Sequence, residues 1–169
     1  MFASIIVLAI LIQASLSCDF PNGTETAVNW WDCGSGGIKI YSITPLDNDG
    51  NFQYPIHLAQ PMWVEAEIDN TVKDYTSADD LIIDILIWQY SGWANCKWTA
   101  VPTFACSNGL TCPIPRGRQT IRVNLDFTVH KQIVSLLKND APYQLQYKVT
   151  DKSTGRYGCA TFQVRAYTK

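Results

Sequence analysis

Hydrophobic and polar residues alternate with a period of two along most of this chain. In the segment TIRVNLDFTV, the apolar positions are Ile121, Val123, Leu125, Phe127 and Val129. The same alternation runs through MWVEAEID at 62–69, YQLQYKVT at 143–150, IKIYSI at 38–43 and ATFQVRAY at 160–167. Because successive side chains of a strand point to opposite faces, this pattern predicts strands with one buried face and one wet face.

One segment departs from this alternation. LIIDILIWQ at 81–89 is apolar on both faces except at Asp84, which predicts a central strand covered on both sides. KQIVSLLKND predicts a short helical turn with Ile133, Leu136 and Leu137 on one side. Turn sequences such as DNDGN at 47–51 separate the strands. Six or seven strands with such turns predict an antiparallel β-sandwich.

The first seventeen residues, MFASIIVLAILIQASLS, are apolar and end in small residues. This run is shorter than the roughly 20 residues that a membrane span needs, so 1–17 is predicted to be a secretory signal peptide. A lipoprotein acceptor site at Cys18 is the alternative, although such signals normally carry basic residues near their start. Residues 18–169 are then expected to form one domain.

Charge and sequence motifs narrow the functional classes. The formal net charge is −2, and the basic cluster RGRQTIR at 116–122 is assigned to a turn and the outer face of a strand, so nucleic acid is disfavoured. The sequence contains no nucleophile elbow, zinc-protease motif or phosphate-binding loop. His57 and His130 are expected to be surface or hydrogen-bonded histidines. We therefore expect no enzyme, no cofactor and no metal site.

The chain contains six cysteines, which should be mostly disulfide-bonded in an oxidising compartment. Six cysteines permit 15 pairings, so spacing alone does not fix the connectivity. The short interval from Cys106 to Cys112 suits a local bridge, and a bridge from Cys33 to Cys159 would tie the two ends of the domain together. No C-x-x-C pair or nearby histidine supports the rival reading of a zinc site. Asn22 begins the glycosylation sequon NGT.

Three segments together resemble a known family. CSNGLTCPIPRG, the closing YQLQYKVTDKSTGRYGC and the early NWWDCGSGGIKIYSITPLD are similar to the MD-2-related lipid-recognition (ML) family over roughly residues 28–167. Within it, the likeness is greatest to the ganglioside activator and extends to Niemann–Pick type C2 protein. The resemblance implies an all-β, immunoglobulin-like antiparallel β-sandwich of about seven strands with a lipid cavity between the sheets. It also implies the bridges Cys33–Cys159 and Cys106–Cys112. Cys18 and Cys96 match no bridge of the family, and their pairing, with each other or not at all, stays open at this point.

The resemblance implies a secreted or lysosomal protein that binds and transfers a sterol, phospholipid or glycolipid. A transient membrane surface and a lysosomal hydrolase or receptor are the partners it suggests. The residues expected to line the cavity are Val64, Ile83, Ile85, Ile87, Val123, Leu125, Phe127, Leu145 and Tyr147. Alternation alone fits an ordinary filled core equally well. The alternative function is therefore an extracellular module that recognises protein or glycan on an outer sheet face.

The stretch WANCKWTAVPTFAC at 93–106 is rich in aromatic residues but has neither helical nor strand periodicity. We expect Trp93, Trp98 and Phe104 to surround the cavity mouth, because tryptophan suits a boundary between apolar and wet surroundings. In that position they would dock on a membrane. The alternative is that these aromatic side chains fold inward and cap the core.

Overall fold

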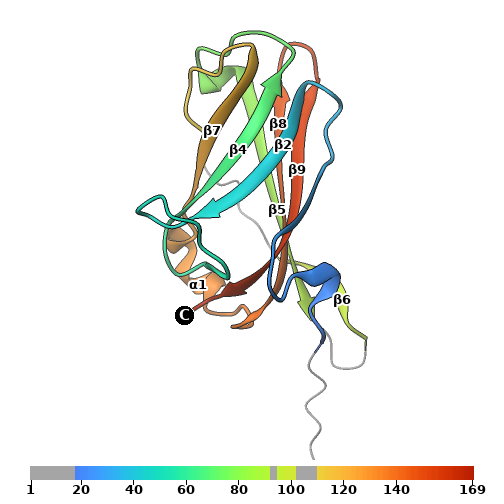
Figure 1. Cartoon of the computed structure of the whole chain (residues 1–169), viewed down its shortest axis with the longest axis vertical. Helices are drawn as coiled ribbons and strands as arrows, with labels where there is room; N and C mark the ends of the chain where they lie inside the picture. The colour runs from blue at the N-terminus through green and yellow to red at the C-terminus, as the bar shows by residue number, and fades with distance from the viewer. Residues whose placement is uncertain (1–17, 92–94, 102–109) are drawn as a thin grey trace, which may run out of the picture.

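The computed structural model describes residues 18–91, 95–101 and 110–169 of the chain (Figure 1). Its strands are β1 (Asn29–Asp32), β2 (Ile38–Leu46), β3 (Ile56–His57), β4 (Met62–Asn70), β5 (Leu81–Ser91), β6 (Lys97–Val101), β7 (Gly117–Leu125), β8 (Ala141–Asp151) and β9 (Tyr157–Tyr167). Its short helical turns are η1 (Pro21–Gly23), η2 (Ala78–Asp80), η3 (Thr128–His130) and α1 (Lys131–Val134). No helix in these ranges is long and apolar enough to cross a membrane.

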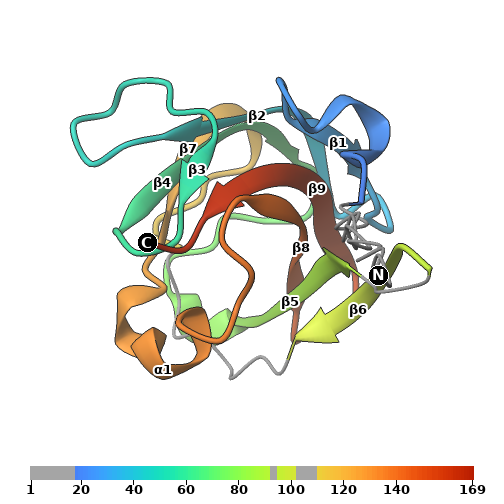
Figure 2. The ribbon, with the colours of Figure 1, turned by 90° about the horizontal axis from the view of Figure 1, so that it is seen from below.

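The strands form two sheets that pack face to face. The larger sheet has the order β1-β9-β8-β5-β6, with β3 paired in parallel to β9, and the smaller sheet has the order β2-β4-β7. The other pairings between named strands are antiparallel. Figure 1 shows β2, β4 and β7 in front of β5, β8 and β9, and Figure 2 shows the two layers from below. The predicted all-β antiparallel sandwich is confirmed, with β1, β3 and β6 as strands that the alternation did not reveal.

The period-two pattern places the core where the sequence predicts it. Along β4, residues alternate strictly between buried and half-buried, with Met62, Val64, Ala66 and Ile68 inside. The opposite face of this sheet carries ion pairs between β4 and β7. Arg118 Nε lies 2.6 Å from Glu67 Oε1, and Arg122 Nη2 lies 2.9 Å from Glu65 Oε2. The basic cluster at 116–122 therefore contributes these two arginines to a solvated sheet face.

Strand β5 differs from its prediction. It pairs with β8 from Leu81 to Gln89, so it has a neighbour along almost all of one side. Only one of its faces is covered, however, because Ile82 and Leu86 on the other face are 46% and 43% exposed. A sandwich has two layers, and among the described residues no third layer covers these side chains. The prediction that both faces are buried is wrong.

The segment after β7 also differs in part. The strand ends at Leu125, and η3 and α1 follow, so the predicted helical turn is present. Phe127 is buried, but Val129 is 70% exposed because the strand alternation no longer applies there. Leu136 is 85% exposed and does not join the buried side of the turn.

Two disulfides tie the chain to the larger sheet. Cys33, just after β1, is bonded to Cys159 of β9, which is the pair that the family resemblance implies. Cys18 is bonded to Cys96, just before β6. They close loops of 126 and 78 residues, and the chain-entropy model gives each about 4–5 kcal/mol. Neither joins the larger sheet to the smaller one.

Candidate functional site

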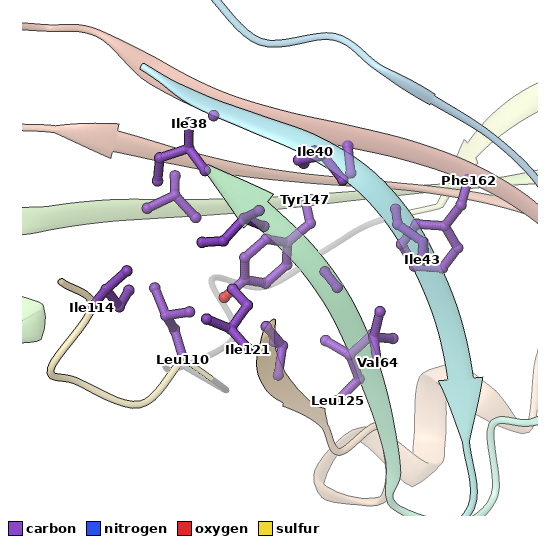
Figure 3. Close-up of a pocket in the computed structure, with 16 residues that line it drawn as sticks. Ile38, Ile40, Ile43, Val64, Leu110, Ile114, Ile121, Leu125, Tyr147 and Phe162 are labelled. Atoms are coloured by element: carbon purple, nitrogen blue, oxygen red, sulfur yellow. The ribbon is translucent and has the colours of Figure 1, made fainter. Parts of the chain in front are cut away.

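An apolar cavity lies between the two sheets (Figure 3). Each of β2, β4, β7 and β9 contributes three of its sixteen lining residues, β8 contributes two, and the segment before β7 supplies the rest. The lining residues are Ile38, Ile40, Ile43, Val64, Ala66, Ile68, Leu110, Ile114, Ile121, Val123, Leu125, Tyr147, Val149, Gly158, Ala160 and Phe162. The cavity is therefore formed by the inward faces of both sheets and closed on one side by residues of an irregular segment.

A β-bulge in β2 shapes this lining. The pairing of β2 with β4 shifts between Ile40 and Ser42, so that Tyr41 has no partner in the register. Such an extra residue reverses the face on which the following side chains lie. Ile38 and Ile40 before the bulge and Ile43 after it all line the cavity as a result. Tyr41 lies outside, with its ring centroid 4.3 Å from the Arg118 guanidinium carbon.

A glycine allows the two sheets to approach closely beside the cavity. A Cβ atom placed on Gly158 of β9 would lie 2.6 Å from the Cβ of Ile38 on β2. Real side-chain carbons do not come so close, so only glycine permits this distance between β2 and β9. The sheets therefore meet tightly along the β2–β9 edge.

The volume of the cavity limits what it accepts in this form. The centre of a water-sized sphere can reach about 60 Å³ of the cavity, and the empty space amounts to about 630 Å³ when the open solvent at its edge is included. A water molecule needs about 10–15 Å³ of the volume that its centre can reach, so about four to six water molecules fit in the cavity. A whole lipid needs more room, and the sheets must move apart to admit one.

The chemistry of the lining is almost entirely hydrocarbon. None of the sixteen residues carries a charged side chain, and the Tyr147 hydroxyl is the polar group that Figure 3 shows in the cavity. Water is poorly held in a space without polar partners, and an ion buried there costs several kcal/mol. The cavity is therefore suited to an uncharged, apolar guest.

Four of the nine residues predicted to line the cavity do so, namely Val64, Val123, Leu125 and Tyr147. The other five pack in the hydrophobic core without lining the cavity: Ile83, Ile85, Ile87, Phe127 and Leu145. The β5 isoleucines do not line the cavity because, within the larger sheet, the cavity lies over β8 and β9. Strand β5 lies on the far side of β8 from β9. Leu145 is 2% exposed and fully packed, and Phe127 lies beyond the end of β7.

Most of the lining residues that were missed lie on strands that the alternation does identify. Ile38, Ile40 and Ile43 on β2, and Ala160 and Phe162 on β9, carry the period-two signal, but nothing in that signal separates cavity from filled core. The bulge that turns Ile43 inward has no clear sequence mark. Leu110 and Ile114 come from an irregular segment, where periodicity gives no information.

The predicted aromatic mouth is only partly described. Trp93 and Phe104 lie outside the described residues. Trp98 is on strand β6, although the sequence showed no strand periodicity there, and it pairs with Tyr90 of β5, with ring centroids 5.0 Å apart. Tyr90 is on the same face of β5 as the exposed Ile82 and Leu86, so Trp98 lies on the outer face of the larger sheet, away from the cavity.

The remaining predicted sites are placed as follows. Cys112 forms no disulfide with a described cysteine, and its predicted partner Cys106 lies outside the described residues. Asn22 is exposed, and its Nδ2 donates a hydrogen bond to Gln163 Oε1 at 2.7 Å. The ring centroid of His57 lies 5.1 Å from that of Tyr167. Among the described residues, no group of three or more His, Cys, Asp or Glu side chains is arranged to hold a metal.

No protein-family model matches the chain, and no curated protein matches it in sequence. Among solved structures, a Niemann-Pick type C2 protein from Japanese carpenter ant has a TM-score of 0.46 at 12% identity, over 82% of this chain and 98% of that one. The C-terminal domain of wzt has a TM-score of 0.46 at 14% identity, over 82% of this chain and 77% of that one. Chicken MD-1 complexed with lipid IVa has a TM-score of 0.35 at 13% identity, over 82% of this chain and 98% of that one. At these values the likenesses carry no argument about function.

Proposed function

We propose that this protein binds a lipid between its two sheets and is not itself an enzyme. The observation that carries the proposal is the cavity, whose lining is hydrocarbon apart from one hydroxyl and contains no charge. Each methylene moved from water into such a site contributes about 0.8 kcal/mol. A guest with a dozen buried methylenes gains roughly 10 kcal/mol before the costs of ordering it are subtracted.

The cross-links of the fold are compatible with a cavity that expands. Neither of the two described disulfides joins the larger sheet to the smaller one, so no cross-link among the described cysteines holds the two sheets together. The tight approach of Gly158 to Ile38 keeps β2 against β9 at one edge. We infer that the sheets separate away from this edge when a lipid enters.

Delivery of the lipid to a membrane is the second part of the proposal. Val129 and Leu136 are exposed and belong to the segment that contains η3 and α1. Figure 1 shows α1 at the end of the sandwich near the C-terminus. Exposed Lys131 and Lys138 lie in the same segment. Apolar side chains beside lysines favour contact with an anionic bilayer. Secretion to the extracellular space or lysosome, cleavage after residue 17, glycosylation of Asn22 and presentation to a hydrolase or receptor belong to the same proposal.

A matched pair of substitutions tests lipid binding. Ile121→Ser removes apolar surface from the cavity lining, whereas Ile82→Ser makes the same change on the outer face of the larger sheet. We expect Ile121→Ser to weaken binding of a fluorescent fatty acid or sterol by about tenfold or more, since about three buried carbons are lost. Ile82→Ser should leave binding unchanged. Equal effects of the two substitutions, with both variants folded, would reject the cavity as the binding site.

A second candidate is a recognition module that uses an outer sheet face. Trp31, Ile82 and Leu86 are each at least 40% exposed on the outer face of the larger sheet. Trp31 and Leu86 belong to one cross-strand row, since Trp31 pairs with Thr161, Thr161 with Gln146, and Gln146 with Leu86. Exposed apolar residues on one face are a common feature of protein contacts. This candidate predicts that Ile82→Ser weakens partner binding and that the cavity stays empty.

A further inference from the structure

The residues that precede β1 lie against the outer face of the larger sheet. Cys18 is bonded to Cys96 at the β6 edge of this sheet. The Phe20 ring centroid lies 5.0 Å from the guanidinium carbon of Arg165, which points outward from β9 between two fully buried neighbours. Residues 18–22 therefore pass over one end of the outer face, from the β6 edge to β9, and occupy that end themselves.

Asn22 lies where this covered end meets the rest of the outer face. It is exposed and begins the sequon NGT. Its Nδ2 donates to Gln163 Oε1 at 2.7 Å, and Gln163 pairs with Gln144 of the central strand β8. An asparagine side-chain nitrogen carries two hydrogens, so one can stay in this bond when a sugar replaces the other. A glycan on Asn22 would therefore be attached directly over β9.

The part of the outer face next to Asn22 exposes apolar side chains. Trp31 of β1 and Leu86 of β5 are 40% and 43% exposed. They belong to one cross-strand row, two residues along the strands from the row that contains Gln163. Neighbouring strands are about 4.8 Å apart and successive residues about 3.4 Å, which places Trp31 about 8 Å and Leu86 about 12 Å from Gln163. The first few sugars of an N-linked glycan span such distances.

The polar groups between these apolar side chains suit a sugar. Gln163 Nε2 donates to Gln144 Oε1 at 2.9 Å, and Gln146 lies two residues further along β8. Each amide can form further hydrogen bonds, which sugar hydroxyls supply while the C–H groups of the ring cover apolar surface. A purely apolar partner would bury these amides without satisfying them. In the next row, Asp84 and Lys148 are paired and carry opposite charges, so the face favours a neutral occupant.

We propose that Asn22 carries an N-linked glycan that lies over the outer face of the larger sheet and covers Trp31 and Leu86. This inference rests on the proposed secretion of the protein and is independent of lipid binding. The glycan shields an apolar patch that would otherwise favour association with other proteins. The recognition module described above as the second candidate needs the same face to be open, so the two accounts exclude each other.

The test is hydroxyl-radical footprinting read by mass spectrometry, which reports the exposure of single side chains. Three forms secreted by eukaryotic cells are compared: the protein with a high-mannose glycan, the same protein trimmed to one sugar by endoglycosidase H, and Asn22→Gln. We expect Trp31 and Leu86 to be oxidised about threefold more slowly in the untrimmed glycoprotein than in Asn22→Gln, because sugars in van der Waals contact cover most of their exposed area. Phe52 is the matched control, since it is 65% exposed and is bridged to Leu46 of the smaller sheet. Its oxidation should be the same in all three forms.

The trimmed form makes the test independent of the substitution. Asn22 has a φ of 55°, which glutamine adopts less readily, so Asn22→Gln can fail to fold. The trimmed glycoprotein keeps the natural chain, and its single sugar does not span the distance to Leu86. We therefore expect trimming alone to restore fast oxidation of Leu86.

The outcomes separate this inference from the proposed secretion. A secreted protein without a glycan on Asn22 would overturn the inference, and so would a glycoprotein in which trimming leaves the oxidation of Leu86 unchanged. Retention of the chain inside the cells, with residues 1–17 still attached, would contradict the proposed secretion, and the inference would fall with it.

Discussion

Filling the cavity with a larger side chain should stabilise the protein and weaken lipid binding at the same time. Ala66 of β4 lines the cavity, and leucine at this position adds three carbons that enter the same space as a guest. Burying them contributes about 2.4 kcal/mol, from which about 0.5–1 kcal/mol of side-chain entropy is subtracted. The free energy of unfolding of Ala66→Leu should therefore rise by about 1.5–2 kcal/mol. A guest that can bury three fewer methylenes in the cavity should bind about 50-fold more weakly.

The assay is urea denaturation of the lipid-free protein, together with titration of a fluorescent fatty acid. Ala166 supplies the matched control, because it is 0% exposed and does not line the cavity. Ala166→Leu overpacks a filled region and should lower the free energy of unfolding by about 1–3 kcal/mol. If Ala66→Leu destabilises the protein as Ala166→Leu does and leaves lipid affinity unchanged, the interior at Ala66 is filled core, and the reasoning from the cavity is refuted.

Two further predictions follow from single contacts. Gly158→Ala places a Cβ 2.6 Å from the Cβ of Ile38. Urea denaturation should therefore show that the free energy of unfolding falls by about 1–3 kcal/mol. An unchanged free energy of unfolding would mean that the β2–β9 distance adjusts freely. The hydrogen bond and charge of Arg165 lower the pKa of the Asp140 carboxyl. A lowered pKa in the folded state means stability that is present above the ordinary value of about 3.9 and is lost as pH falls through the folded pKa. The contribution of the Asp140–Arg165 pair to the free energy of unfolding should therefore stay constant between pH 7 and pH 5 and fall at lower pH. In Asp140→Asn, the free energy of unfolding should fall less steeply below pH 5 than in the wild-type protein. Parallel falls in the two proteins would contradict this.

The fold was largely predictable because period-two alternation reports burial directly. Alternate residues from Met62 to Ile68 and from Tyr143 to Val149 face inward, as the pattern predicts. The prediction failed on β5, where apolar residues on both faces of the strand were taken to indicate burial on both faces. Ile82 and Leu86 are apolar yet exposed, since an apolar residue can lie on a surface without any local mark that distinguishes it.

The candidate site was only half predictable, for a geometric reason. Alternation shows which side chains point inward, Tyr147 and Val123 among them, but it does not show where inward-facing residues leave a gap. That gap depends on the bulge at Tyr41 and on the close approach at Gly158, which are three-dimensional features. Strand register likewise places Trp98 on the outer face of the larger sheet, although the aromatic-rich segment at 93–106 suggested a position at the cavity mouth.

The most direct test of the central claim is mass spectrometry of an organic extract of the protein, purified without added lipid from cells that express it. A lipid-binding cavity predicts a lipid present at close to one molecule per chain, released by the solvent and reduced in Ala66→Leu. A clean extract, together with no uptake of a fluorescent fatty acid or sterol by the purified protein, would contradict the claim that the space between the sheets is a binding site.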